Sequence, residues 1–452
     1  MDDLADRIRL ALARGATTRA QLQHELSVSQ PSLSRAISHL GDQVVRLGRG
    51  RTTRYGLRNE LPQIGSAWPI FVIDPKGDPS LLGTLQALAR NQYWFDADSP
   101  ALNELSDGLP FFLQDLWPQG FIGRTVSRRF PELRLPERVA DWNEIHVLTY
   151  LTQRGDDTIG NLLVGGESLS RFFEQSAGRQ TRMDSNDRSV QYPRLAESAI
   201  AGSPAGSSAG GEHPKFTAVV QTNNTPRHVL VKFSPARTDR VAQRWSDLLI
   251  AEHVAANALR SLGVPSAATE LVVAGDRMFL ESERFDRTGE RGRKGIISLA
   301  AVADHYLGRR DNWITTAGSL ASIRRISAQD ADAVRRAATF GRMIGNTDMH
   351  FGNLSFFFVP GGALTLAPIY DMLPMMYAPI ATDELPELDF QFPLPGADTL
   401  DIWRSAAELA QAYWHDVASH PLISPDFASR AANNAAAAAQ ARKLVSNTSK
   451  TA

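Results

Sequence analysis

Cysteine is absent from the 452-residue sequence, which excludes a disulfide framework, thiolate zinc sites and cysteine nucleophiles. Uninterrupted apolar stretches of secretory or membrane-spanning length are also missing. We therefore expect a cytoplasmic protein with no membrane partner. An excess of charge of either sign is missing as well, because 48 Lys and Arg stand against 49 Asp and Glu. Only the local distribution of charge can indicate a partner.

The residues that are present have the composition of a globular protein. Hydrophobic residues make up 43% of the chain and charged residues 21%, which is enough apolar material for a large core. At roughly 100 to 200 residues per domain, the length predicts two to four domains that fold without metal or disulfide support.

The first 58 residues are basic within this neutral chain. They contain ten arginines and five acidic residues, a local net charge of +5. Apolar residues at helical spacing predict three short helices, and the second begins at a capping box that opens with Thr18. Two strand-like runs, 44–47 and 52–57, then flank a Gly-Arg-Gly-Arg turn. This order predicts a winged helix-turn-helix over residues 1–60.

A winged helix-turn-helix places its third helix in the major groove of DNA. The outward positions of that helix include Ser32, Ser34 and Arg35, which we expect at base edges, while Arg49 and Arg51 in the turn contact phosphates or the minor groove. Residues 1–58 are thus predicted to bind double-stranded DNA. The alternative is a small helical domain used for dimerisation or docking.

Residues 61–185 show strand signals, aromatic clusters and one helical pattern, but no recognisable chemistry. We predict a small β-containing subdomain with a helix and a linker. The polar segment 175–190 is expected to be a flexible connection.

The next segment combines features that bind phosphate in other proteins. A Gly- and Ser-rich run, 201–215, precedes a strand, and small residues let backbone N–H groups approach phosphate oxygens. Lys232 follows in an alternating strand, and Glu252 lies in a helical pattern over 239–262. In protein kinases a strand lysine contacts the nucleotide phosphates and pairs with a helix glutamate.

A second polar cluster follows about one hundred residues later in the chain. Asp348 and Asn353 are five positions apart, and Asp371 lies beyond a predicted hairpin. An aspartate can accept the proton of an acceptor hydroxyl, while asparagine and a second aspartate supply the oxygen ligands that Mg²⁺ prefers. A polar surface turn is the alternative, but polar residues between apolar runs indicate a partly buried turn that needs partners.

Together these segments resemble a known family, the HipA-like serine/threonine kinases of bacterial toxin–antitoxin systems. The resemblance lies in GNTDMHFGNLSFF and LAPIYDMLP, with ERFDR at 283–287 and SSAGGEHPK at 207–215. It spans most of residues 65–445 and implies ATP and Mg²⁺ as cofactors. By position, it implies that Asp348 is the catalytic aspartate, Asn353 and Asp371 are Mg²⁺ ligands, and Lys232 with its partner Glu252 binds the ATP phosphates.

The resemblance also implies an ATP-binding surface. Glu283, Arg284 and Phe285 correspond to the hinge that touches adenine, and Ser208 to the serine that family members autophosphorylate. The remaining ATP-site positions are Ser207, Ala209, Gly210, Gly211, Lys215 and His350, of which His350 is expected to orient the catalytic loop by hydrogen bonds. Family substrates include aminoacyl-tRNA synthetases, so the implied partner is a protein substrate.

Two departures from the family pattern stand out. A helix-turn-helix is fused ahead of the kinase, which resembles the YjjJ-type branch and leaves open whether a separate antitoxin partner is needed. Relatives with a Ser-x-Ser loop carry a second serine where this chain has Gly210.

The sequence thus predicts an α+β protein with three parts. These are a winged helix-turn-helix (1–60), a small β-containing subdomain (61–185) and a bilobal kinase (186–452) with an N-lobe at about 186–285 and a helical C-lobe at about 286–445. We predict ATP-dependent serine/threonine protein phosphorylation with self-phosphorylation. Two alternatives are a DNA-binding regulator whose kinase-like body only senses nucleotide, and a small-molecule phosphotransferase of the aminoglycoside-kinase type.

Overall fold

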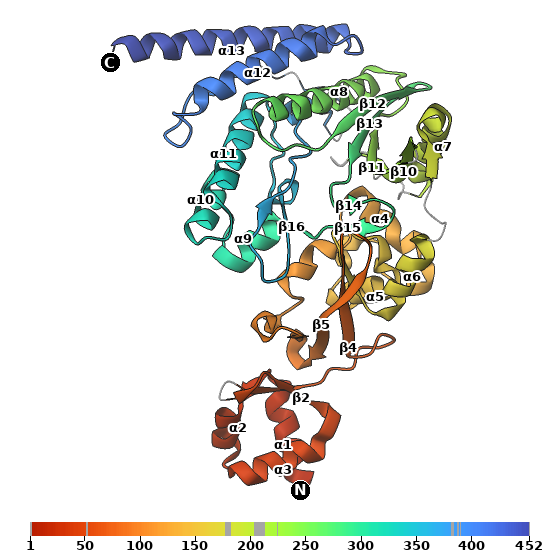
Figure 1. The fold of residues 1–452 in the computed structure, drawn as a ribbon, viewed down its shortest axis with the longest axis vertical. Coiled ribbons are helices and arrows are strands. Elements are labelled where there is room, and N and C mark those ends of the chain that lie inside the picture. Colours follow the sequence, from red (N-terminus) through yellow and green to blue (C-terminus); the bar gives the residue numbers. More distant parts are fainter. Residues whose placement is uncertain are drawn as a thin grey trace. The chain divides into compact units, whose positions relative to one another are not determined.

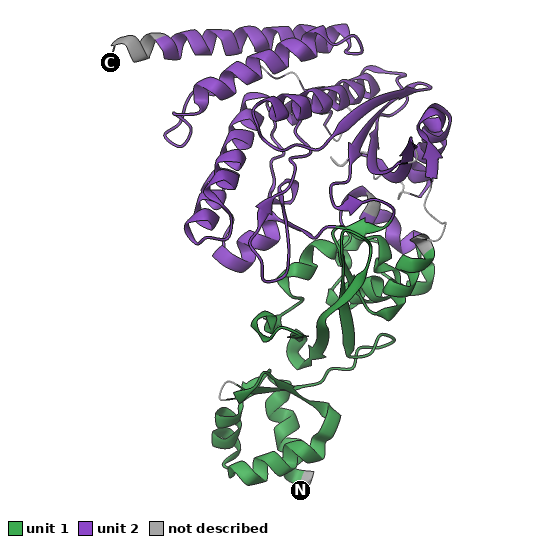
Figure 2. Ribbon diagram, viewed as in Figure 1, with its two compact units in different colours: residues 1–118, 130–179, 291–293 green, residues 119–129, 180–290, 294–452 purple. Residues whose placement is uncertain are grey.

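The computed structural model divides the chain into two compact units (Figure 2). Unit 1 consists of residues 1–118, 130–179 and 291–293, and unit 2 of residues 119–129, 180–290 and 294–452. The structure describes residues 2–50, 53–176, 182–202, 213–223, 225–380, 384–386, 388 and 390–451. The domain boundaries at residues 60 and 185 stay predictions.

Unit 1 begins with three helices and a three-stranded sheet in the order β1-β3-β2 (Figure 1). The elements are α1 (Asp2–Ala13), β1 (Thr17–Thr18), α2 (Arg19–Leu26), α3 (Gln30–Leu40), β2 (Val44–Leu47) and β3 (Arg54–Leu57). The capping box at Thr18 is confirmed, because its side chain accepts from the backbone N–H of Gln21 and the Gln21 side chain returns the contact. The predicted apolar stripes of the helices meet in one core around Ile8, Leu22 and Leu33.

The rest of unit 1 is built on a five-stranded antiparallel sheet in the order β7-β6-β5-β4-β8. Its elements are β4 (Ala67–Ile73), β5 (Pro79–Leu88), β6 (Gln92–Ala97), β7 (Glu104–Asp107), α5 (Glu144–Arg154), β8 (Leu162–Val164), α6 (Gly166–Ser176) and β15 (Gly292–Arg293). Ile73 and Leu163 of the sheet pack against Phe172 of α6. A small β-containing body, as predicted, therefore occupies the middle of the sequence.

Unit 2 contains a second five-stranded sheet, in the order β12-β13-β11-β10-β9. The elements of this region are α4 (Gly120–Arg129), β9 (Arg182–Asp184), α7 (Arg188–Ala201), β10 (Lys215–Thr222), β11 (Thr225–Phe233), α8 (Arg240–Ser261), β12 (Thr269–Ala274), β13 (Arg277–Glu283) and β14 (Arg287–Thr288). The expectation of a flexible connection over 175–190 is wrong for its described part. Residues 182–184 pair in parallel with β10, and α7 begins at Arg188.

The alternation of strand β11 decides which side chains face which helix. Val229, Val231 and Phe233 are buried in a cluster that includes Tyr192 of α7. Because successive strand residues point to opposite faces, Lys232 lies on the other face, toward α8. The charged side chain of Lys232 therefore faces α8, the helix that carries the Glu252 carboxylate.

The remainder of unit 2 is mostly helical. Its elements are β16 (Ile296–Ser298), α9 (Leu299–Leu307), α10 (Trp313–Ser322), α11 (Ala328–Met343), β17 (Ser355–Phe357), β18 (Thr365–Leu366), α12 (Trp403–Ser419) and α13 (Pro425–Thr451). The predicted hairpin after Asn353 is confirmed, because β17 pairs with β18. Helices α12 and α13 lie side by side (Figure 1). Among the helices of the described residues, none has the length and apolar content to cross a membrane.

Helix α8 is fixed to the C-terminal helices by a buried arginine. Arg244 is 2% exposed and donates to the backbone carbonyl of Tyr377 over 3.2 Å and to Asp426 over 2.7 Å. Its guanidinium also lies 5.0 Å from the centre of the Phe427 ring. One turn later, Asp247 accepts from the backbone N–H and the hydroxyl of Ser424. The first half of α8 is thus held by ionic and hydrogen-bonded contacts on one side.

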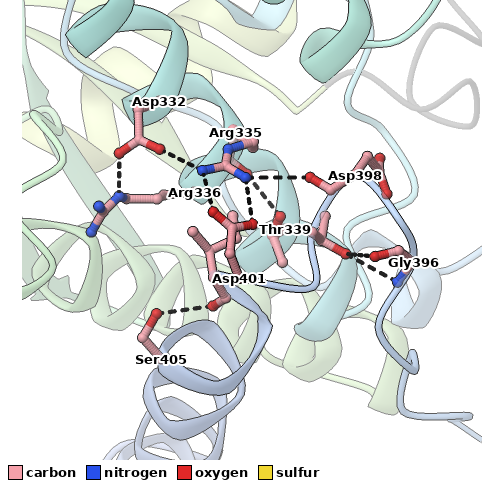
Figure 3. A network of polar contacts seen from close by, with 10 residues as sticks. Asp332, Arg335, Arg336, Thr339, Gly396, Asp398, Asp401 and Ser405 are labelled. Atoms are coloured by element: carbon pink, nitrogen blue, oxygen red, sulfur yellow. Dashed lines mark hydrogen bonds and ion pairs between the residues drawn. The ribbon is translucent and has the colours of Figure 1, made fainter.

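A second arginine network joins α11 to the segment before α12 (Figure 3). Arg335 makes a two-pronged ion pair with Asp401, with distances of 2.7 and 2.9 Å, and a further pair with Asp332 at 2.8 Å. Arg336 also reaches Asp332, at 2.7 Å. Hydrogen bonds and ion pairs with these carboxylates raise the pKa of Arg335 despite partial burial. The side chain of Asp401 is 67% exposed, so solvent screens this network more than it screens Arg244.

These two arginines should therefore differ in their contribution to stability. Arg244→Met should lower the free energy of unfolding by about 2 kcal/mol, because it removes the hydrogen bonds to the Tyr377 carbonyl and to Asp426 and the cation–π contact with Phe427. Arg335→Met, the matched control, should cost no more than about 1 kcal/mol. Thermal melting of both full-length proteins measures the difference, which for a body of this size is a few degrees. An equal or larger loss for Arg335→Met would contradict the assignment of Arg244.

Candidate active site

The centre of the site is a buried ion pair between a strand and a helix. Nζ of Lys232 on β11 lies 2.7 and 2.8 Å from the two carboxylate oxygens of Glu252 on α8. Both residues are almost fully buried, at 5% and 4% exposure. The sequence predicted this pair, and the structure brings the two residues into direct contact.

The same ammonium group also contacts Asp371, from a segment 139 residues away in the sequence. The backbone of Asp371 adopts a left-handed conformation, with φ of 55°, which aspartate tolerates better than most residues do. One lysine therefore lies between two carboxylates.

The electrostatics of this triad follow from burial and from the shared cation. Burial works to raise the pKa of Asp371, but the ammonium groups of Lys232 and Lys215 outweigh it and lower the pKa to about 2. Burial raises the pKa of Glu252, and the neighbouring Asp371 carboxylate acts in the same direction, against Lys232. Asp371 is thus ionised at neutral pH, as a metal ligand must be.

The loop after α11 carries the next two predicted residues. Nδ2 of Asn353 donates to the backbone carbonyl of Asp348 over 2.9 Å, which closes the loop on itself. Asn353 is buried, whereas Asp348 is exposed. The expectation of a partly buried turn is therefore confirmed, with the asparagine inside and the aspartate outside.

A residue that sequence reasoning did not single out joins this loop to Asp371. Asn346 is buried, its Oδ1 accepts from the backbone N–H of Asp348 over 3.0 Å, and its Nδ2 donates to the backbone carbonyl of Asp371 over 3.4 Å. In the sequence, Asn346 could be noticed only because it lies two residues before Asp348 in the same polar run. Its partner across the site could not be inferred from local spacing.

His350 makes hydrogen bonds within the loop that carries Asp348 and with α10. Its Nδ1 accepts from the backbone N–H of Gly352 over 3.0 Å, and its carbonyl accepts from Nε1 of Trp313 on α10 over 3.2 Å. Its imidazole therefore has an orienting contact within the loop.

The predicted hinge lies at the end of β13, close to the Asp371 segment. The Phe285 ring lies 6.0 Å from the ring of Tyr370, whose hydroxyl donates to the carbonyl of Gly352. Arg284 pairs through its side chain with Asp286 at 3.0 and 3.1 Å, and half-exposed Glu283 ends the strand. A small pocket is lined by both triad carboxylates, Ser282 beside the hinge, and Tyr370.

Two further groups of the site lie on β10 and just before it. Lys215 stands directly opposite Lys232 in the strand register. His213, which the sequence analysis did not single out, has a pKa lowered to about 3 by burial and by the two lysines. Its only signal was its place inside the SSAGGEHPK run.

Several predicted positions fall outside the described residues. These are Ser207, Ser208, Ala209, Gly210 and Gly211 of the loop, and Arg51 of the N-terminal turn. The other predicted DNA contacts lie on or beside α3 and β2. Ser34, Arg35 and Arg49 are exposed, whereas Ser32 is half-buried and its hydroxyl lies 3.0 Å from that of Ser29, the N-cap of α3.

Comparisons with known proteins agree with this geometry. A family model described as the HipA-like C-terminal domain matches residues 207–449, and one described as the middle domain of YjjJ-like toxins matches residues 64–173. Toxin YjjJ of Escherichia coli (strain K12) is 36% identical over 430 residues, which cover 94% of this chain and 95% of that protein.

Among solved structures, HipA from a Shewanella oneidensis complex of HipA, HipB and operator DNA shares the fold. It matches with a TM-score of 0.50 and 15% identity, over 83% of this chain and 99% of the other. The sequence-based resemblance is therefore confirmed, and the chain belongs to the HipA-like toxin family, in its YjjJ branch.

Proposed function

We propose that the protein is an ATP- and Mg²⁺-dependent serine/threonine protein kinase. The observation that carries this proposal is the contact of Lys232 with both Glu252 and Asp371. In protein kinases the strand lysine pairs with a helix glutamate, and the metal-binding aspartate must be in place beside them. All three positions are filled here by the residues that this chemistry needs.

The donor set fits Mg²⁺. Asp371 supplies an ionised carboxylate, and Asn353 supplies an amide oxygen while its nitrogen is used by the carbonyl of Asp348. Mg²⁺ prefers such oxygen ligands together with substrate phosphates. When bound, Mg²⁺ and ATP supply a transferable phosphoryl group whose developing negative charge is neutralised.

Different residues of the chain then bind phosphate, position the reacting groups and accept a proton. Lys232 and Lys215 place positive charge on one face of the sheet, where phosphate oxygens bind. Glu252 holds the Lys232 ammonium, and Asn346 positions both the Asp348 loop and the Asp371 segment. Asp348, exposed on its loop, accepts the proton of the acceptor hydroxyl.

Removing the Asp348 carboxylate tests the kinase assignment. Asp348→Asn should lower phosphotransfer by about 10² or more, because general-base catalysis contributes roughly 10² to 10⁴. Asp416→Asn, an exposed aspartate on α12, is the matched control and should retain activity. Mass spectrometry of each purified protein after incubation with ATP and Mg²⁺ gives the readout. Near-normal turnover in folded Asp348→Asn protein would overturn the assignment.

Self-phosphorylation belongs to the same proposal, with Ser208 as the modified residue. Phosphoserine adds about −1.5 to −2 charge to the loop that we propose binds the ATP phosphates, and that charge would repel the anionic nucleotide. Ser208→Asp should therefore bind ATP more weakly than wild type, whereas a Ser207/Ser208 double alanine variant should not. Calorimetry measures both affinities. Equal ATP affinity of Ser208→Asp and wild type would contradict the switch while leaving the kinase intact.

The same reaction centre could serve a small hydroxyl compound or act as a nucleotide sensor. Family membership favours a protein acceptor, and the complete set of Lys232, Asp348, Asn353 and Asp371 favours catalysis over sensing. Mass spectrometry of the protein itself separates a self-phosphorylating kinase from a sensor, because a sensor acquires no phosphate.

We propose DNA binding by residues 1–58 as a second function. Its basis is the order of three helices, α1–α3, and the β1-β3-β2 sheet, with Ser34 and Arg35 exposed on α3 and Arg49 exposed after β2. The related HipA was solved in a complex with HipB and operator DNA, so an antitoxin partner also belongs to this proposal.

Charge removal at the turn after β2 tests the DNA proposal. The Arg49→Ala, Arg51→Ala double variant should flatten the log–log salt dependence of DNA affinity by roughly 2, if each arginine neutralises one phosphate. Arg309→Ala in unit 2 is the control and should leave the slope unchanged. Fluorescence anisotropy with labelled duplexes over a range of salt concentrations measures the slope. Wild-type protein that shows no salt-dependent binding at low ionic strength would favour the docking role instead.

A further inference from the structure

His213 lies on the face of the sheet that carries Lys215 and Lys232. The backbone N–H of Phe233 donates to the carbonyl of Pro214 over 3.2 Å, so the β10–β11 pairing continues one residue before β10 begins. Side chains two residues apart on extended backbone point to the same side. His213 therefore shares a face with Lys215, and through the strand register with Lys232.

Helix α8 closes over this face at two points. Trp245 and Glu252 are seven residues apart, which places them on one side of the helix. Glu252 contacts Lys232, and the Trp245 ring lies 4.6 Å from the His213 ring in an edge-to-face arrangement. The imidazole is thus held in one orientation by an aromatic neighbour.

Within the described residues, one nitrogen of this imidazole has no hydrogen-bond partner. Although His213 as a whole is partly exposed, its Nε2 is buried and has no hydrogen-bond partner within the part of the chain that the structure describes. A buried polar group without a partner is unfavourable, and such groups usually have a binding role. With Lys215 and Lys232 nearby, the complementary ligand group is an anion.

We propose that His213 is a positioning residue for the nucleotide phosphates, with Nε2–H donating to a phosphate oxygen. The inference rests on the proposed nucleotide site and adds a neutral donor to its two lysines. A neutral N–H adds direction without adding a third positive charge beside Lys215 and Lys232. Trp245 fixes the ring, so little side-chain freedom is lost on binding.

Three substitutions separate this role from simple packing. His213→Phe keeps the ring contact with Trp245 but removes Nε2, whereas His213→Gln keeps an N–H donor at about the same distance from the backbone. Trp245→Phe reports on the aromatic contact alone. Circular dichroism and thermal melting check that each full-length variant is folded.

The measurement is the calorimetric affinity for two probes, ATP with Mg²⁺ and adenosine, which lacks phosphates. His213→Phe should weaken ATP binding by about 10-fold or more, the range expected for a hydrogen bond to a charged group, and leave adenosine binding unchanged. His213→Gln should bind ATP within a few-fold of wild type. Trp245→Phe should fall between wild type and His213→Phe for ATP, with adenosine unchanged.

Two results would overturn the inference. Wild-type ATP affinity in His213→Phe would show that Nε2 does not contact phosphate. Equal weakening of ATP and adenosine would show that His213 only packs against Trp245. Failure of the wild-type protein to bind either probe would instead overturn the nucleotide site itself, so the two failures are distinguishable.

Discussion

The Lys232 ammonium between two carboxylates is the constraint on which the rest of the kinase-like unit depends. A buried lysine is costly unless its charge is paired, and here the partners come from a helix 20 residues away and a segment 139 residues away. The strand alternation, the length of α8 and the left-handed backbone of Asp371 each serve to bring one of these groups to the others. Asn346 then links the Asp348 loop to the Asp371 segment.

Local sequence patterns revealed much of this arrangement because the signals themselves are local. Alternation predicted that Lys232 lies in a strand, helical periodicity placed Glu252 in a helix, and the Thr18 capping box gave the beginning of α2. Strand β9 was missed because Met183 is its single buried residue, too few for a detectable alternation. Asn346 and His213 were missed because their significance arises from contacts with residues that are distant in the sequence.

The N-terminal helices provide a contrast with the kinase-like unit, since their core cluster lies within residues 4–57. Their apolar stripes and caps are readable residue by residue, and the structure reproduces them closely. Family membership adds what periodicity cannot supply, because the matched models and Toxin YjjJ cover the middle sheet, where no chemical motif is visible. Residue periodicity thus predicts the N-terminal helices, whereas family membership identifies the middle domain.

The burial of Arg244 has a consequence for regulation. Many protein kinases are controlled by moving the helix that carries the glutamate, which separates it from the strand lysine. In this protein such a swing would pull Arg244 out of its contacts with Tyr377, Asp426 and Phe427, and Asp247 away from Ser424. The structure thus holds the Lys232–Glu252 pair assembled, with α8 fixed by contacts away from that pair. Under the proposed kinase function, control would act on access to the face that carries Lys215 and Lys232 rather than on the position of α8.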